Sequence, residues 1–192
     1  LVAASATSAK LSAASDGPGG KLAITGGTVI TASGERIEKA VLLIENGRIA
    51  AVGANLAVPW DAEVIDASGK VVFPGLVLAH TQESLDTANE NVSVTPFISV
   101  LDGINAVNLF YEESLRAGTL SILVIPGNNT VIGGQGRVVK PFGLTVEEMT
   151  VLAQGGMKLS TAPKRGTNAM AHMAEMRKAF ASFRDELQVE AE

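Results

Sequence analysis

Cysteine is absent from the 192-residue chain, which excludes disulfide bonds and thiolate metal ligands. That absence fits a cytosolic protein and an extracytoplasmic protein equally well. The chain also lacks an apolar run of about 20 residues, the length that a membrane-spanning helix needs. The formal net charge is −5 with no basic tract, which argues against nucleic acid as the main partner.

Hydrophobic residues make up 46% of the chain, so it can bury a substantial core. Residues 1–20 are rich in Ala, Ser and Gly and predict a flexible leader. The chain begins at Leu1, and Ala4-Ser5-Ala6 has the small residues of a signal-peptide cleavage site. The alternative is an ordinary Ala/Ser leader. Cytoplasmic and periplasmic or secreted locations therefore both stay open.

Residues 21–70 consist of short β-rich runs separated by turns. Asn46-Gly47 stands between two apolar runs, which is the strongest short signal for a β-hairpin. Both central residues of a type I′ turn need positive φ, and Asn and Gly tolerate it. We therefore expect residues 21–70 to form a small antiparallel, sandwich-like β-unit.

The next apolar run, residues 71–79, is interrupted by Pro74-Gly75 and ends at His80 and a polar cluster. A run bounded in this way predicts a strand that is buried on both faces. Polar groups just past the carboxyl end of such a strand are where α/β proteins place their chemistry. This stretch is the first candidate for a functional site.

A helix is expected to follow, capped by Asp102, running to about Arg116 and stopped by Gly118. Its apolar face would contain Ile104, Val107, Tyr111 and Leu115. A second buried strand is expected at residues 119–125. Strand, helix and strand in this order predict a parallel βαβ unit with a right-handed crossover.

Residues 126–136 are rich in Gly and Asn and predict a long loop at the carboxyl end of the second strand. Thr145 with Glu148 predicts a capping box, and residues 157–160 a third short strand. The last helix is expected to start near Thr167, with His172 on its surface. Its apolar stripe is expected to pack in a core; the stripe consists of Met170, Met173, Phe180, Phe183 and Leu187.

Together these segments resemble the amidohydrolase superfamily. The resemblance is carried by residues 24–30, 44–53 and 69–76, and it extends over residues 21–185. Residues 126–136 resemble the branch related to imidazolonepropionase. The resemblance implies an α/β fold in which the β-unit precedes a (β/α)8 barrel, with residues 71–192 as a partial barrel. It also implies metal-dependent hydrolysis, with zinc as the expected ion, of a C–N bond in an amide or cyclic amide.

The chain departs from the family at its metal motif, Asp-x-His-x-His. Leu78 stands at the aspartate position, His80 keeps the first histidine, and Gln82 replaces the second. A glutamine amide is a weak ligand for zinc. The segment at residues 160–165 also lacks the acidic residue expected near the third strand. We therefore expect this chain alone to bind zinc weakly and to be inactive.

His80 is a candidate metal ligand and Gln82 a weaker one; the alternative for His80 is a histidine hydrogen-bonded at a strand end. Glu83 and Asp86 are candidate oxygen ligands or, alternatively, solvated loop carboxylates. Lys158 faces the site or is a surface lysine. The candidate substrate pocket is formed by Glu83, Asn128, Gly133, Gly134, Gln135 and Lys158.

Three hypotheses for function follow. The first is an amidohydrolase with a small-molecule substrate. The second is a non-catalytic paralogue or partner subunit that kept the scaffold and lost the metal. The third is a truncated piece of a larger enzyme. A partial barrel leaves an unpaired edge strand and uncovered apolar faces, so we expect a homo-oligomer or association with a missing C-terminal half of the barrel.

Overall fold

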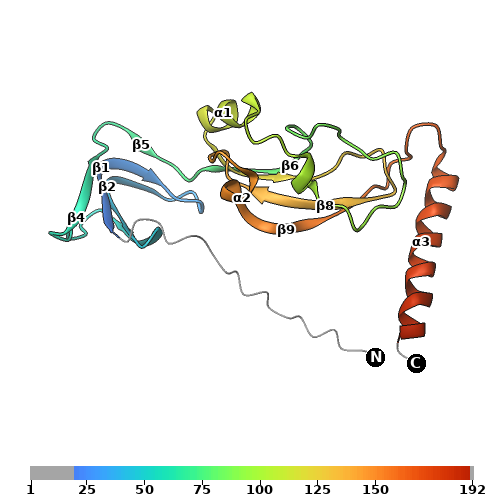
Figure 1. Cartoon of the computed structure of the whole chain (residues 1–192). Coiled ribbons are helices and arrows are strands. Elements are labelled where there is room, and N and C mark those ends of the chain that lie inside the picture. The colour runs from blue at the N-terminus through green and yellow to red at the C-terminus, as the bar shows by residue number, and fades with distance from the viewer. Residues whose placement is uncertain (1–19, 191–192) are drawn as a thin grey trace. The chain divides into compact units, whose positions relative to one another are not determined.

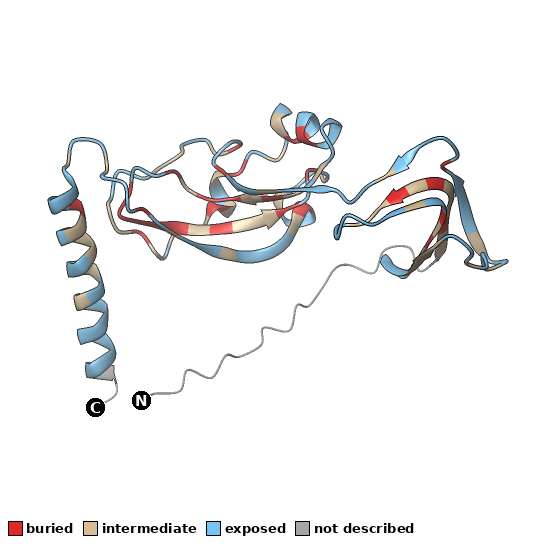
Figure 2. Cartoon of the chain, turned by 180° about the vertical axis from the view of Figure 1, so that it is seen from behind, coloured by how far each residue is buried: buried red, intermediate tan, exposed pale blue. Residues whose placement is uncertain are grey.

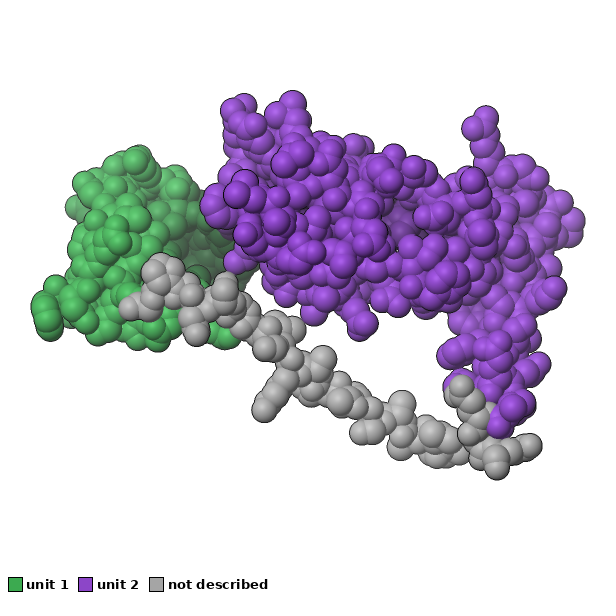
Figure 3. Space-filling view, in the orientation of Figure 1, with its two compact units in different colours: residues 1–74 green, residues 75–192 purple. Residues whose placement is uncertain are grey.

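The structure, a computed structural model, describes residues 20–190, and Figure 1 shows the order of its helices and strands. The leader and the signal-peptide site predicted near the start lie outside the described residues. The chain divides into two compact units, residues 1–74 and residues 75–192, which are coloured separately in Figure 3. None of the helices within residues 20–190 is long and apolar enough to cross a membrane.

The first unit forms one five-stranded mixed sheet, with the order β3-β2-β1-β4 and with β5 also paired to β1. The strands β1 to β3 pair antiparallel, as predicted. β4 and β5 instead pair in parallel with β1, because the chain crosses from β3 at one edge to the far side of β1. The strands are β1 (Lys21–Ile30), β2 (Arg36–Glu45), β3 (Arg48–Gly53), β4 (Ala62–Asp66) and β5 (Val71–Val72).

The hairpin between β2 and β3 turns at Asn46 and Gly47, as predicted. Their φ angles are 51° and 71°, and Glu45 pairs with Arg48 across the turn. Positive φ at both central residues is the requirement of a type I′ turn. The local sequence therefore determined this hairpin.

The second unit contains a four-stranded sheet with the order β6-β7-β8-β9. β6 (Leu76–Thr81) and β7 (Thr119–Val124) pair in parallel, which confirms the predicted parallel unit. β8 (Ile132–Val139) and β9 (Thr150–Leu159) continue the sheet in antiparallel pairs. Two sheets with helices give a mixed α/β architecture that is consistent with a partial TIM-barrel-type domain.

The prediction of a loop over residues 133–136 is wrong, because these residues belong to β8. Their glycines are needed for close packing rather than for a turn. A Cβ at Gly134 would lie 2.8 Å from the Ile98 carbonyl oxygen, and one at Gly136 would lie 2.9 Å from the Val124 carbonyl oxygen. The short strand predicted at residues 157–160 is the end of a longer strand, β9, which begins at Thr150 and ends at Leu159.

The helix expected from Asp102 to Arg116 is two separate elements. A 3-10 helix, η1 (Val100–Gly103), is capped by Ser99, and α1 (Leu109–Arg116) is capped by Asn108, whose Oδ1 accepts the Phe110 N–H at 2.9 Å. Asn105 Oδ1 accepts the Val107 N–H at 3.2 Å, so the segment between the helices is a turn that exposes Val107. The predicted stop is confirmed, since Gly118 follows α1 with a φ of 82°.

The predicted capping box lies at α2 (Val146–Met149). Thr145 Oγ1 accepts the Glu148 N–H at 3.3 Å, and the Glu148 carboxylate accepts the Leu144 N–H at 2.9 Å. α2 and η1 contribute Met149 and Val100 to the core of the second unit. That core consists of Val100, Ile104, Tyr111, Ile122, Val124, Val139 and Met149.

The prediction that β6 is buried on both faces is wrong. Leu76 is 51% exposed and Val77 71% exposed, and His80 is also exposed. β6 is the edge strand of its sheet, and within residues 20–190 no further strand pairs with its outer edge. An apolar strand at an edge retains the composition of a buried strand without its cover.

Two predictions for the last helix, α3 (Ala169–Glu190), are also wrong. The apolar stripe is not in a core: Met170 is 78% exposed and Phe183 58% exposed, and Figure 2 shows α3 exposed along most of its length. His172, expected on the surface, is fully buried. It is buried because its ring fits against the segment before the helix, where both ring nitrogens find partners.

Candidate functional site

The carboxyl ends of β6 and β7 lie at the same edge of the second sheet because the two strands are parallel. The Ile125 N–H, just after β7, donates to the carbonyl oxygen of Thr81, the last residue of β6, at 2.9 Å. The polar residues that follow each strand are thereby held next to each other. This edge is where α/β folds place ligands and chemistry.

His80 and Lys158 meet at this edge. Lys158 Nζ lies 2.9 Å from His80 Nε2, although the two residues are 78 positions apart. Lys158 is on β9, near its end, and the antiparallel pairs of β8 with β9 place it there. Partial burial lowers the pKa of Lys158. The pair can therefore hold a proton between an amine and an imidazole.

Gln82 lies against the connection that follows β7. A Cβ built at Gly127 would overlap Gln82 Oε1 and lie 2.7 Å from Asn89 Nδ2, so the Gln82 amide lies directly beside the Gly127 backbone. The Gly127 N–H donates to the Ala88 carbonyl oxygen at 2.7 Å. The amide of Gln82 is thus packed beside the backbone rather than paired with His80.

Asn128 contributes its backbone to the site. Its carbonyl oxygen accepts a hydrogen bond from Ser160 Oγ at 3.0 Å, and the next residue, Asn129, donates its N–H to Asn89 Oδ1 at 2.9 Å. Asn129 Oδ1 also accepts the Arg165 N–H at 2.6 Å. These bonds join the loops after β6, β7 and β9.

A buried network that the sequence did not reveal continues from Ser160, which is 3% exposed. The Ser160 carbonyl oxygen lies 2.8 Å from His172 Nε2, which donates to it, and His172 Nδ1 accepts the Lys164 N–H at 3.2 Å. Lys164 Nζ is hydrogen-bonded to Ser93 Oγ. The first turns of α3 are thus anchored to the same edge. The one sequence feature that could have indicated this network is the segment at residues 160–165, which resembles a family segment near the third strand.

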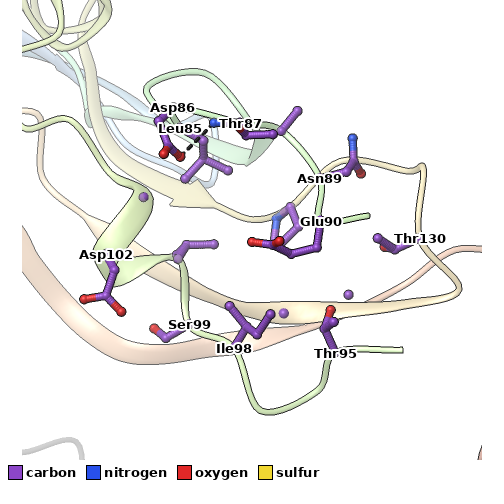
Figure 4. Close-up of a pocket in the computed structure, with 16 residues that line it drawn as sticks. Leu85, Asp86, Thr87, Asn89, Glu90, Thr95, Ile98, Ser99, Asp102 and Thr130 are labelled. Carbon is purple, nitrogen blue, oxygen red and sulfur yellow. Dashed lines mark hydrogen bonds between the residues drawn. The ribbon is translucent and has the colours of Figure 1, made fainter. Parts of the chain in front are cut away.

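A cavity of about 200 Å³ opens under the segment that follows β6 (Figure 4). Gly133 and Gly134 line it, and the remaining residues of the expected pocket lie elsewhere. Gln135 Nε2 donates to the Pro96 carbonyl oxygen at 3.0 Å. Glu83 is exposed, and its N–H donates to Thr81 Oγ1 at 3.0 Å.

The residues at this edge do not fit a zinc site. Within residues 20–190, no group of three or more His, Asp or Glu side chains could hold a metal ion. His80 Nε2 is occupied by Lys158, and both ring nitrogens of His172 are hydrogen-bonded. Glu83 and Asp86, the expected oxygen ligands, are exposed and do not converge with His80.

Comparison with known proteins adds a set of partial matches, and no family model matches the chain. A dihydroorotase from Mycobacterium tuberculosis is 38% identical over 76 residues, which cover 38% of this chain and 17% of that protein. A D-hydantoinase from Geobacillus stearothermophilus is 50% identical over 58 residues, covering 30% of this chain and 12% of that protein.

Among solved structures, an amidohydrolase from Thermotoga maritima matches with a TM-score of 0.81 and 27% identity. The match covers 88% of this chain and 49% of the Thermotoga chain, so this chain spans about half of its length. Together the matches support the amidohydrolase superfamily for this protein.

Proposed function

We propose that this protein is a hydrolase that opens a C–N bond in a cyclic amide. The observation that carries the proposal is the His80–Lys158 pair at the carboxyl edge of parallel strands. It is supported by the fold likeness to the Thermotoga amidohydrolase. The dihydroorotase and the D-hydantoinase among its relatives have names that denote ring-opening hydrolysis of cyclic amides.

The His80–Lys158 pair suits two requirements of this reaction. Water adds to the amide carbonyl carbon, the C–N bond breaks, and the leaving nitrogen takes a proton. A lysine ammonium next to the carbonyl would stabilise the negative charge that develops on its oxygen. The lowered pKa of Lys158 makes its ammonium a better proton donor to the leaving nitrogen, with His80 Nε2, 2.9 Å away, as its hydrogen-bond partner.

The branch of the superfamily is a finer part of the proposal. Residues 126–136 resemble the branch related to imidazolonepropionase, whereas the relatives described above are a dihydroorotase and a D-hydantoinase. We assign the chain to the branch related to imidazolonepropionase because residues 126–136 begin just after the carboxyl end of β7, where the candidate site lies. Its substrate would then be a small cyclic amide.

A second candidate function is a non-catalytic scaffold, and one observation favours it. Leu78 and Gln82 replace two residues of the family motif, and the remaining His80 is hydrogen-bonded to Lys158. A cation beside Nε2 disfavours a second cation on the same nitrogen. In this alternative the motif is degenerate, and the pair stabilises the strand ends instead of reacting.

Ring-opening assays separate the two candidates. Dihydroorotate and hydantoin are incubated with the purified protein, with added zinc and after chelator treatment, and the open-chain acid is quantified. The hydrolase proposal expects product that is reduced at least about a hundredfold in both His80→Ala and Lys158→Ala, whereas Lys140→Ala, which removes an exposed lysine, has no effect. No product under either condition would favour the scaffold. Product unaffected by both variants would show that the His80–Lys158 pair does not carry the reaction.

A further inference from the structure

The large apolar side chains along α3 follow the spacing of a coiled coil. They recur at alternating intervals of three and four residues, which is the heptad period of about 3.5 residues. A helix that packs on a sheet or a mixed core usually has a wider apolar stripe, whereas this strict alternation gives the narrow seam that a partner helix covers. We call these residues the α3 seam; they are Met173, Met176, Phe180, Phe183 and Leu187.

The outer part of the α3 seam is open to solvent in the part of the chain that the structure describes. Phe180 is 49% exposed, Phe183 58% and Leu187 50%, and α3 is exposed along most of its length (Figure 2). The first turn of the helix is anchored instead, because His172 is buried with both ring nitrogens hydrogen-bonded. An anchored helix thus presents an uncovered apolar seam.

The two edges of the seam differ in charge. Arg177 and Arg184 occupy the e positions of the heptads, along one edge. Glu186 occupies a g position on the other edge, and Glu175 lies further round the helix on that same side. Arg184 Nη2 lies 3.6 Å from Asp185, but both side chains are mostly exposed, so this pair holds the arginine only weakly. The seam therefore has a basic edge and an acidic edge.

This charge pattern is complementary to itself in one direction only. In a parallel pair of helices, the e edge of one helix faces the g edge of the other, so the basic edge meets the acidic edge. In an antiparallel pair each edge faces its own kind, which places arginines opposite arginines and is unfavourable. The matching surface for the α3 seam is therefore the same seam on a parallel helix.

We propose that α3 is a dimerisation helix whose seam pairs in parallel with the α3 seam of a second copy of this chain. Phe180 and Phe183 form the centre of the interface, and the charged edges set its direction. This interface goes beyond the proposed hydrolase function, because it does not depend on whether the His80–Lys158 pair reacts.

The absence of native cysteine allows a direct test by cross-linking. In a parallel pair each seam residue lies against the same residue of the other copy, whereas in an antiparallel pair Leu187 lies opposite Met173. Leu187→Cys is therefore expected to give a disulfide-linked dimer with oxidised glutathione, and Lys178→Cys, an exposed site on the far side of α3, is not. Equal yields at the two sites, or no cross-link in Leu187→Cys, would overturn the proposal.

A second pair of variants shows whether the seam itself drives the cross-link. Phe183→Asp, added to Leu187→Cys, places a charge in the apolar interface and should lower the yield at least about tenfold. Val189→Asp is the matched control, since Val189 is 76% exposed on the side of α3 away from the seam. Neither substitution removes a buried side chain, so both chains should keep the melting temperature of the parent. An equal loss of yield in both would contradict the assignment.

Charge reversal tests the direction of pairing, again in the Leu187→Cys chain. Arg177→Glu with Arg184→Glu makes both edges acidic and should lower the yield about three- to tenfold at low salt. Adding Glu175→Arg and Glu186→Arg makes the edges opposite in charge again and should restore the yield. An unchanged yield in the first variant, or no recovery in the second, would show that the edges do not select a parallel copy.

Discussion

Tyr111 and Ser84 form a buried hydrogen bond in the core of the second unit, with their hydroxyl oxygens 2.7 Å apart. Tyr111 is 3% exposed and Ser84 also 3%. Tyr111→Phe leaves the Ser84 hydroxyl without its partner, and we expect a loss of about 1–3 kcal/mol in unfolding free energy. Denaturant unfolding measures this loss. The double variant Tyr111→Phe with Ser84→Ala should recover part of it; a fully additive loss would show that the bond contributes nothing.

The same tyrosine predicts a dependence of stability on pH. Burial raises the pKa of Tyr111 above its ordinary value near 10. The stabilisation of the folded state that this raised pKa reflects is fully present below pH ~10, the pKa of tyrosine in the unfolded chain. As pH rises from there, the unfolded chain loses the phenolic proton while the folded protein keeps it, so stability falls. Thermal melts from pH 8 to about 11 should show a steeper decline for the unmodified protein than for Tyr111→Phe.

Individual residues also show where sequence reasoning succeeded and failed. The positive φ at Asn46 and Gly47 was predictable because a type I′ turn depends on these two residues alone. The burial of His172 was not, since its partners, Ser160 and the Lys164 N–H, lie outside the helical pattern used to place it. The His80–Lys158 contact joins residues 78 positions apart, and no local signal encodes it.

At the scale of elements, glycine was the residue most easily misread. Several glycines of β8 suggested a turn, whereas they permit neighbouring backbones to pass at close range. Gly134→Ala should therefore destabilise the protein, because the new Cβ would lie 2.8 Å from the backbone oxygen of Ile98, which cannot easily move. We expect a cost of about 1–3 kcal/mol, measured by denaturant unfolding.

A matched control exists at Gly53, where a new Cβ would make ordinary contact with the Leu56 side chain at 3.4 Å. Gly53→Ala is expected to change stability by about 1 kcal/mol or less. Equal effects of the two substitutions would show that close packing is not the reason for glycine in β8. For β6, the apolar composition correctly predicted a strand. It did not predict the exposure of that strand, because burial depends on neighbouring strands and helices that the local composition does not reveal.

At the scale of the whole molecule, uncovered apolar surface is the main feature. Val77 on the edge strand β6 is 71% exposed, and Phe183 on α3 is 58% exposed. Unpaired strand edges and apolar patches promote association, so we expect the purified chain to self-associate. Sedimentation velocity should show species larger than one chain. Val77→Lys should shift them towards the monomer. A concentration-independent monomer would refute this expectation.

The central claim is that the end of β6 carries a hydrogen-bonded His80–Lys158 pair in place of a metal chelate. Gln82, at the position of the second motif histidine, packs beside Gly127. The claim also means that Gln82→His, which restores two histidines one residue apart, should raise zinc affinity measurably.

The most direct measurement is the zinc content of the protein after dialysis, together with zinc titrations of the unmodified chain, Gln82→His and His80→Ala. We predict that the unmodified chain retains no stoichiometric zinc and that Gln82→His binds it more tightly. Stoichiometric zinc in the unmodified chain, lost in His80→Ala, would contradict the account and would make His80 a metal ligand.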